Sequence, residues 1–389
     1  MKILCITSRV PWPLEKGDKL RAYHQLKRLS ARHQVILFAL TDTPVHPDAE
    51  TELRKFCSEV YVHRHGKIRS LMNLAGGLFS RLPFQVAYFT SGSGLKAVKR
   101  FHQTHRPDAV YCQLIRTAEY RKQLPVKVPS VIDYMDVFSK GVERRIPNVP
   151  FLLRWLFRME WKRLLAYERD VFPYFSGHTV ISSQDRDLLP VADLSHIAVV
   201  PNGVDTDFFS ADSGAVKEFD LLFNGNMNYP PNVESVVFVV KEVMPLVWEK
   251  RPGTRLLISG ANPSPAVKAL AGEKVVVTGW VDDVRDSFNR SRLLIAPMKS
   301  SIGLQNKLLE AMAMGLPCIT TELSNNALGA KPGEEIIVAD TAAAFAESAL
   351  RMLNDPAEAS RIADKALAMV KRRYDWEAFG LQLEAVLKG

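Results

Sequence analysis

Cysteine and long apolar runs are both scarce in this chain of 389 residues. The four cysteines, at positions 5, 57, 112 and 318, form no Cys-x-x-Cys pair and show no metal-ligand spacing. Their arrangement excludes a disulfide framework and a structural zinc site, and it is typical of a reduced, cytoplasmic protein. No uncharged apolar stretch reaches the ~18 residues of a transmembrane helix. The apolar run that follows Lys2 is too short for the core of a signal peptide.

The common sequence signals of phosphate and metal sites are missing as well. No Gly-x-Gly-x-x-Gly follows the first apolar run, no Walker-type loop occurs, and the nine histidines show no paired metal spacing. Two Asp-x-Asp patterns, at 185–187 and 205–207, are present. About one such pattern is expected by chance at this aspartate content, so we predict no metal site.

Acidic residues are unevenly distributed. Residues 1–200 hold 31 basic and 18 acidic side chains, whereas residues 201–389 hold 20 and 24. The segment 60–107 contains no Asp or Glu and mixes basic with large apolar residues, as does the shorter segment 151–158. This mixture predicts an anionic membrane surface as partner, through residues 60–107. The alternative is a buried helix with a solvated basic face; nucleic acid is not favoured, because no nucleic-acid-binding module is recognisable.

Short apolar runs alternate with amphipathic segments, which predicts βα units and parallel sheets. Strands are expected at 2–7, 34–39, 108–112, 130–134, 178–182 and 197–200, and helices at 18–32 and 152–172. The pattern restarts after 201, with strands at 220–224, 255–259, 275–278, 293–296, 318–321 and 335–338 and helices at 233–249 and 304–314. We therefore predict two doubly wound α/β domains, 1–200 and 201–372, and a C-terminal helix in 373–389 that packs back on the first domain. Ligands of such sheets bind at the carboxyl ends of the strands.

The segment 300–315 runs from a glycine-bearing loop into a helix. Free N–H groups and a partial positive charge at a helix N-terminus suit a phosphate, and Lys307 in the first turn adds a point charge. Glu310, three residues later, lies on a nearby face and suits a pair of sugar hydroxyls. An ordinary amphipathic helix with solvated Lys and Glu side chains is an equally good interpretation of this local pattern.

Several motifs resemble one family. Gln305-Asn306-Lys307 followed by Leu309-Glu310-Ala311-Met312-Ala313-x-Gly315-x-Pro317 is similar to the donor-site helix of the GT-B glycosyltransferases of family 4, the group 1 glycosyltransferases. Pro201-Asn202-Gly203-Val204-Asp205 resembles the interdomain segment of that family. The motifs Gly225-x-Met227-x-Tyr229-x-Pro231-Asn232, Thr278-Gly279-x-Val281-x-Asp283-Val284-Arg285 and Gly17-Asp18-Lys19-x-Arg21 fit its exopolysaccharide branch, which includes exosortase-associated sugar transferases.

The resemblance implies an α/β protein with the GT-B fold, in which two Rossmann-like domains face a cleft. It also implies a retaining transfer from a nucleotide-sugar substrate, without a cofactor or metal. The donor diphosphate would lie on the residues that open the 304–314 helix and on Lys307, and Glu310 would hold the ribose hydroxyls. The expected donor-binding residues are Gly17, Asn226, Gly279, Trp280, Val281, Gly303, Leu304, Gln305, Asn306, Lys307 and Glu310.

The chain departs from the family pattern at three places. Ile302 stands where the family has the first glutamate of its Glu-x7-Glu pattern, and residues 224–228 lack the usual Arg and Lys. Met135 replaces the histidine of a His-Asp step, which leaves Asp136. Together with Lys307 and Glu310 we count Asp136 as a catalytic candidate, one that orients the acceptor hydroxyl. A helix-capping aspartate is the alternative at this position.

These observations predict a glycosyltransferase of exopolysaccharide biosynthesis that transfers a sugar to a glycan or polyprenyl-linked acceptor. It would be cytoplasmic or peripheral on the inner face of the cytoplasmic membrane. A nucleotide-sugar 2-epimerase of the same fold and a non-catalytic binding module remain as alternatives. Epimer formation without acceptor would identify the first of them, and nucleotide release that depends on acceptor would exclude the second.

Overall fold

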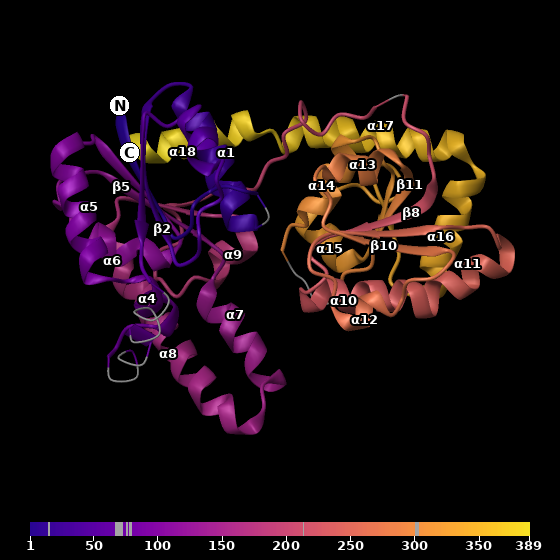
Figure 1. Cartoon of the computed structure of the whole chain (residues 1–389), viewed down its shortest axis with the longest axis horizontal. Coiled ribbons are helices and arrows are strands. Elements are labelled where there is room, and N and C mark those ends of the chain that lie inside the picture. The colour runs from indigo at the N-terminus through magenta and orange to yellow at the C-terminus, as the bar shows by residue number, and fades with distance from the viewer. Residues whose placement is uncertain (15, 67–72, 75–76, 78–79, 213, 300–302) are drawn as a thin grey trace. The chain divides into compact units, whose positions relative to one another are not determined.

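The computed structural model describes residues 1–14, 16–66, 73–74, 77, 80–212, 214–299 and 303–389, which form two compact units (Figure 1). The first unit comprises Met1–Pro201 and Trp376–Gly389, and the second comprises Asn202–Asp375. Each unit is built on one parallel sheet with helices on both faces. This is the Rossmann-like architecture that the alternating patterns predict.

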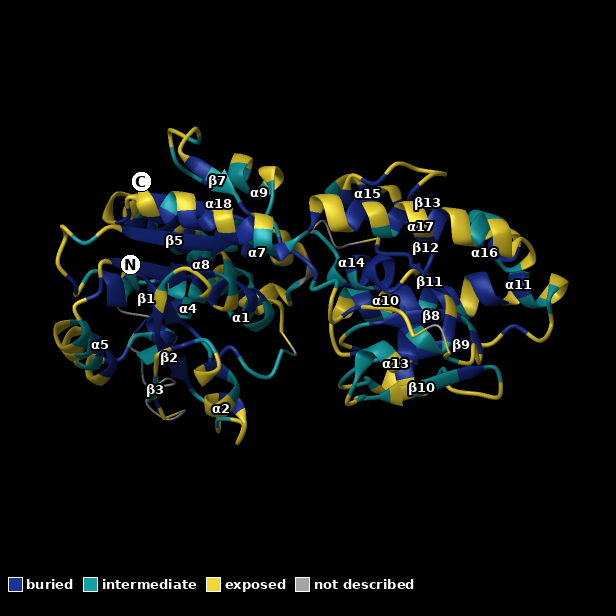
Figure 2. Cartoon of the chain, turned by 90° about the horizontal axis from the view of Figure 1, so that it is seen from above, coloured by how far each residue is buried: buried dark blue, intermediate teal, exposed yellow. Residues whose placement is uncertain are grey.

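The sheet of the first unit has seven parallel strands in the order β3-β2-β1-β4-β5-β6-β7. The strands are β1 (Lys2–Thr7), β2 (Gln34–Thr41), β3 (Glu59–Arg64), β4 (Ala109–Gln113), β5 (Ser130–Met135), β6 (Gly177–Val180) and β7 (Ile197–Val199). β1 and β2 are nearly continuous apolar runs because both faces of these strands are covered, as the dark blue ribbons in Figure 2 show. The direction of strand progression reverses between β1 and β4, which is where such sheets bind ligands.

Two apolar cores flank this sheet. Leu4 and Ile6 of β1 lie in one core, and Ile3 and Cys5 lie in the other, because side chains alternate between the faces of a strand. The helices of this unit are α1 (Gly17–Ser30), α2 (Ala49–Arg54), α4 (Phe84–Phe89), α5 (Gly92–His105), α6 (Ala118–Arg121), α7 (Phe138–Arg145), α8 (Arg154–Val171), α9 (Ser183–Leu188) and α18 (Trp376–Lys388).

The sheet of the second unit has six parallel strands in the order β10-β9-β8-β11-β12-β13. The strands are β8 (Phe219–Asn224), β9 (Leu256–Ser259), β10 (Val275–Gly279), β11 (Ser291–Ala296), β12 (Cys318–Thr320) and β13 (Ile337–Val338). The helices are α10 (Pro230–Phe238), α11 (Met244–Lys250), α12 (Pro265–Lys268), α13 (Val284–Asn289), α14 (Asn306–Ala313), α15 (Glu322–Leu328), α16 (Ala342–Asn354) and α17 (Pro356–Arg373). A π-helical turn, Val239–Val243, joins α10 to α11.

The described part of segment 60–107 contributes its large apolar side chains to the core. Val86 and Val98 are fully buried, and Phe89 is nearly so. Lys96, Lys99 and Arg100 are exposed along α5. Lys67, Arg69, Leu71, Leu78 and Phe79 lie outside the described residues. Apart from Tyr61, this stretch therefore offers cations rather than exposed large apolar groups where the structure describes it. No helix among the described residues is long and apolar enough to cross a membrane.

Candidate functional site

The carboxyl ends of the strands of the second sheet lie at one edge, because all of its strands are parallel. Gly303, Leu304 and Gln305 lead from this edge into α14, which begins at Asn306. The Gln305 side chain donates to the Gly303 carbonyl over 2.7 Å and does not cap the helix. The Leu308 N–H in the first turn of α14 donates to the Gln305 carbonyl over 3.0 Å. The Asn306 and Lys307 N–H groups, which come before it, have no partner within an α-helix and are therefore placed to bind an anion.

The Lys307 side chain extends back from the first turn of α14 and is buried beside β8. Its Nζ donates to Asn232 Oδ1 over 2.7 Å and lies 3.6 Å from Met298 Sδ. The same ammonium lies 4.2 Å from the centre of the Phe223 ring, within the range of a cation–π contact. Only 8% of the residue's surface is exposed. Burial lowers the pKa of Lys307 to about 7, although the charge of Glu310 acts to raise it.

Glu310 lies one turn further along α14 and is half-buried. Its carboxylate forms no hydrogen bond with another residue that the structure describes, so its oxygens are available to an external donor. Burial raises the pKa of Glu310 to about 7, against the opposing effect of Lys307. The two groups thus place an ammonium and a carboxylate on one helix, each close to its titration point at neutral pH.

Gly225, directly after β8, makes room for the Lys307 ammonium. It adopts φ +155, and a Cβ at this position would lie 3.2 Å from Lys307 Nζ and 2.7 Å from Asn232 Nδ2. Gly260, directly after β9, adopts φ +137, and its Cβ would lie 1.8 Å from the Gly225 carbonyl oxygen. Only glycine fits this close approach of two strand-end loops, and the result is a compact floor beside the start of α14.

The remaining donor-site candidates lie at neighbouring strand ends. Asn226 is exposed, and its side chain oxygen accepts from the N–H of Asn228 over 3.0 Å. Gly279 ends β10 with φ +74, and its carbonyl accepts from the Gly260 N–H over 3.0 Å. Trp280 is 59% exposed and Val281 is half-buried. An exposed indole at this edge is suited to stacking on a planar ring. Ile302 lies outside the described residues.

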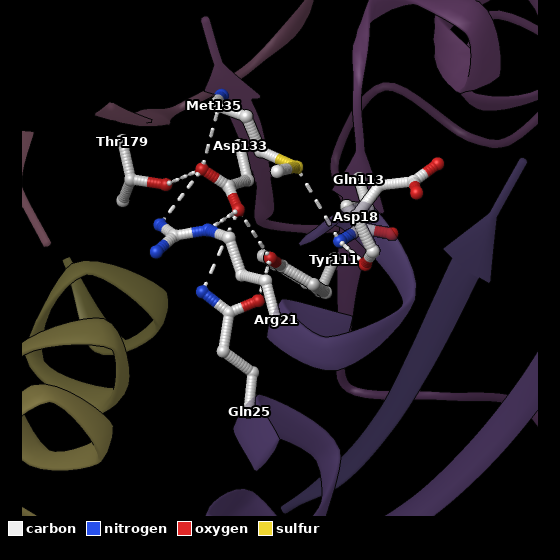
Figure 3. A network of polar contacts seen from close by, with 8 residues as sticks. All are labelled: Asp18, Arg21, Gln25, Tyr111, Gln113, Asp133, Met135 and Thr179. Atoms are coloured by element: carbon white, nitrogen blue, oxygen red, sulfur yellow. Dashed lines mark hydrogen bonds and ion pairs between the residues drawn. The ribbon is translucent and has the colours of Figure 1, made fainter. Parts of the chain in front are cut away.

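A buried ion pair organises the corresponding edge of the first sheet. Arg21 Nε and Nη2 of α1 donate to the two carboxylate oxygens of Asp133 over 2.6 and 3.0 Å, and both side chains are fully buried (Figure 3). Tyr111 and Thr179 also donate to this carboxylate through their hydroxyl groups, over 2.9 and 3.0 Å. The Met135 N–H donates to Asp133 Oδ1 over 3.3 Å. This pair explains why the motif that begins at Gly17 carries an arginine: Arg21 joins α1 to β5.

Strained backbone lies directly beside this network. Met135 ends β5 with φ +58, and Leu114 follows β4 with φ +66, although neither residue is a glycine. Such conformations cost about 1–3 kcal/mol each and cluster at functional sites. Asp136 follows Met135 and carries exposed surface. Loss of hydration by burial raises the pKa of Asp136 to about 6, and the nearby carboxylates of Asp185, Asp133 and Asp18 add to the shift. The charge of Arg21 opposes it.

The capping alternative for Asp136 receives no support, because Val137 is the N-cap of α7 and the Ser139 N–H in the first turn of that helix donates to Glu168. Gly17 is exposed and opens α1. A Cβ on Gly17 would meet nothing within 4 Å, so the fold itself does not require glycine there.

The residues that enclose the Lys307 ammonium and the partners of Arg21 were not predicted from the sequence. Asn232, Phe223 and Met298 carry no motif that points to a lysine 75 residues away from the first of them. Asp133 is separated from Arg21 by 112 residues. A polar residue inside an otherwise apolar strand was the one available signal for Asp133.

Comparison with known proteins finds a family match within the second unit. Residues 218–355 match the family model described as glycosyl transferases group 1. The chain is 23% identical to a Klebsiella pneumoniae protein described as an uncharacterized 44.6 kDa protein in the cps region, over 96% of each chain.

Solved structures share the fold over the whole chain. The sucrose-phosphate synthase of Thermosynechococcus elongatus superimposes with a TM-score of 0.72 at 16% identity, covering 100% of this chain and 98% of the other. HepE of Anabaena, in complex with UDP and glucose, gives 0.68 at 13% identity and covers 99% of both chains. These structural matches confirm the predicted GT-B fold. The family match over residues 218–355 confirms the predicted resemblance to the group 1 glycosyltransferases.

Proposed function

We propose that this protein is a glycosyltransferase and that it binds a nucleotide-sugar donor at α14. The GT-B fold of the chain and the match of its second unit to the group 1 glycosyl transferases support this proposal. The observation that carries the proposal is the placement of Lys307 and Glu310 on one helix turn, beside the carboxyl ends of β8 and β11. The match of HepE, described as a complex with UDP and glucose, supports a nucleotide sugar as donor.

In this proposal the donor diphosphate lies on the first-turn N–H groups of α14 and is neutralised in part by Lys307. Segment 224–228 lacks the basic pair expected after the first strand of this domain. In this proposal the Lys307 ammonium takes the place of that pair, because it lies against Gly225 in the same segment. A Cβ on Gly225 would be 3.2 Å from Lys307 Nζ. Glu310 accepts hydrogen bonds from the ribose hydroxyls, and Trp280 frames the nucleobase.

We propose transfer with retention of the anomeric configuration and without a metal. The bond between the sugar and the diphosphate breaks, the nucleoside diphosphate leaves, and an acceptor hydroxyl bonds to the sugar on the same face. The acceptor proton passes to an oxygen of the departing diphosphate, so the protein needs no strong base. In this proposal Asp136 orients the acceptor hydroxyl, and its pKa of about 6 leaves it ionised at neutral pH.

The acceptor in this proposal is a glycan or a lipid-linked glycan of exopolysaccharide synthesis, and the enzyme works at the inner face of the membrane. The similarity to a protein of a cps region supports the assignment to polysaccharide synthesis. A nucleotide-sugar 2-epimerase would instead convert the donor to its epimer with no acceptor present.

Glu310→Ala is the first test. We expect affinity for nucleoside and nucleoside diphosphate to fall about 10- to 100-fold, the equivalent of one charge-assisted hydrogen bond of ~1.5–3 kcal/mol, with the melting temperature retained. Isothermal titration against a panel of nucleotides measures the change and identifies the base. Glu322→Ala, an exposed first-turn residue of α15 in the same unit, is the matched control. Unchanged nucleotide affinity in the Glu310 variant would refute the site.

Turnover distinguishes the proposed reaction from its alternatives. With the correct donor and acceptor, the glycoside should keep the donor's anomeric configuration by NMR, and its formation should continue in excess chelator. Asp136→Asn should slow transfer while leaving donor affinity unchanged. An inverted product, a strict metal requirement, or epimer formation without acceptor would each contradict the proposal.

A further inference from the structure

Four large apolar side chains are exposed together where α7 turns into α8. Phe151, Leu152, Leu153 and Trp155 keep 81%, 80%, 46% and 60% of their surface exposed. The 3₁₀ turns 146–148 and 151–153 join the two helices into a hairpin. Soluble proteins rarely expose such a run of large apolar residues unless the surface meets a partner.

Cations surround this apolar tip. Residues 138–163 contain seven basic and only two acidic side chains. Both acids are engaged: Glu143 accepts from Lys140 Nζ over 2.8 Å, and Glu160 is buried and accepts the Phe84 N–H over 2.7 Å. Arg145, Arg158 and Lys162 are exposed. The hairpin surface therefore carries an uncompensated positive charge directly behind its apolar end.

The hairpin is fixed at its base, so the tip is presented by an ordered element. Leu164 and Val171 of α8 are fully buried in the core of the first unit. Glu168 accepts from the Ser139 hydroxyl over 2.6 Å and from the Ser139 N–H over 3.0 Å, which ties α8 to α7. In Figure 1 the two helices extend from the sheet of this unit and end in the turn that carries the exposed residues.

A hollow of about 690 Å³ lies along the hairpin behind the tip. Ile146, Trp155 and Met159 supply apolar parts of its lining, and Arg158 and Lys162 supply cations. Trp155 thus belongs both to the exposed tip and to this hollow. The same surface combines exposed apolar side chains, which can enter an apolar layer, with cations that can bind phosphate-bearing headgroups.

We propose that the α7–α8 tip, residues 146–158, docks on an anionic lipid bilayer. A bilayer offers an anionic headgroup layer above an apolar layer, and the hairpin offers an apolar end backed by cations, so the two surfaces are complementary in order and in charge. This assigns membrane contact to the hairpin instead of to segment 60–107, whose described large apolar residues pack inward, Tyr61 excepted. The inference does not depend on the donor or the sugar.

Cosedimentation of the full chain with vesicles tests the proposal. The protein should bind vesicles of phosphatidylcholine mixed with phosphatidylglycerol, bind phosphatidylcholine alone weakly, and dissociate as salt is raised, because salt screens exposed charges. Phe151→Ser with Leu152→Ser, and separately Arg145→Gln with Arg158→Gln and Lys162→Gln, should each lower the partition coefficient about tenfold or more.

The matched control replaces three exposed cations of α5 with glutamine: Lys96, Lys99 and Arg100. It removes the same charge from the same unit and should change binding by no more than about twofold. All three variants should keep the wild-type melting temperature and nucleotide affinity, since the replaced groups are exposed. A chain that binds no nucleotide can still be scored for vesicle binding, so failure of the donor-site proposal remains distinguishable.

Three results would overturn the inference. Wild-type protein that stays in the supernatant with anionic vesicles at low salt excludes the membrane. Equal losses in the hairpin and α5 variants mean that only total charge matters. A hairpin variant that alters self-association in analytical ultracentrifugation, with vesicle binding unchanged, makes the tip an interface between two copies of the chain.

Discussion

Burial changes the protonation of the Lys307 side chain. Its ammonium is enclosed by Phe223, Met298 and the Asn232 amide, and burial brings its pKa down to about 7. At neutral pH the free protein is therefore a mixture of charged and neutral forms of this lysine. A bound anion stabilises the charged form and raises the pKa again, so diphosphate binding takes up a proton.

This linkage predicts the pH dependence of donor binding. Diphosphate affinity relative to nucleoside affinity should be greatest below about pH 7 and should fall as pH rises through the higher pKa of the bound state. Lys307→Met should abolish this slope and cost about 10- to 100-fold in diphosphate affinity. Titration calorimetry at neutral and alkaline pH measures both effects.

Glu310 also has a pKa of about 7, so its titration affects binding in the same pH range. Dividing the diphosphate affinity by the nucleoside affinity cancels this effect, because Glu310 contacts the ribose of both ligands in the proposed site. Lys307→Arg is the charge-preserving control; it should keep the charge but recover only part of the affinity, because a planar guanidinium does not fit the slot of an ammonium. If the Met variant retains the full pH slope, Lys307 does not contact the phosphates.

At the scale of elements, the Arg21–Asp133 pair fastens α1 to β5. The two donors of Arg21 satisfy both carboxylate oxygens, and Tyr111, Thr179 and the Met135 N–H complete the shell. A buried pair of this kind adds little net stability over apolar residues, but removing one partner leaves an uncompensated buried charge. The positions of the Met135 turn and of the following Asp136 depend on it.

Arg21→Met should therefore destabilise the protein by about 3–5 kcal/mol, as measured by urea denaturation. Arg290→Met is the control, because it removes an arginine from the exposed pair with Glu218 in the second unit and should change stability little. A small effect of Arg21→Met would mean that the Asp133 carboxylate is protonated or solvated once its partner is gone.

Helices and strands were predicted correctly where the pattern of apolar residues lies within the element itself. The apolar run of 2–7 and the helical spacing of 18–32 correspond to β1 and α1. β3 was not predicted, because Glu59–Arg64 is only half-buried and alternates weakly at the edge of the sheet. The helix expected at 233–249 is interrupted by a π-helical turn at Val239–Val243, which the apolar periodicity does not reveal.

At the scale of the whole molecule, the chain leaves the first unit near Pro201 and returns to it at Trp376. The returning helix α18 packs on α1: Trp376 stacks on His24 with ring centres 4.9 Å apart, and Leu383 and Leu387 join the core that contains Leu26. A Cβ on Gly380 would lie 2.8 Å from that of Arg28, so the two helices are in close contact.

Deleting residues 376–389 should consequently unfold the first unit and spare the second. The deletion removes four large buried side chains, Trp376, Phe379, Leu383 and Leu387. Each contributes about 1.5–3 kcal/mol, and together they are a large fraction of a domain's stability. Limited proteolysis followed by mass spectrometry should recover a resistant fragment that spans the second unit. Deleting only the exposed Lys388 and Gly389 is the control and should leave both units resistant. Equal resistance after the longer deletion would show that α18 is dispensable.

Features that depend on neighbouring residues could be predicted from the sequence. Apolar runs and helical spacing indicated two parallel α/β units, and the motif around Lys307 and Glu310 indicated the helix at which a donor is expected to bind. These signals are local, because strand and helix periodicity and a helix N-terminus extend over a few residues.

The surroundings of those residues, in contrast, depend on the tertiary structure. Lys307 owes its lowered pKa to side chains from β8, α10 and the segment after β11, and Asp133 owes its partner to a helix 112 positions earlier. Segments 60–107 and 151–158 have a similar mixture of basic and apolar residues. The described large apolar residues of 60–107 pack inward, apart from Tyr61, whereas Phe151 and Leu152 face solvent. Burial and pairing depend on contacts between distant parts of the chain, and composition and periodicity do not encode those contacts.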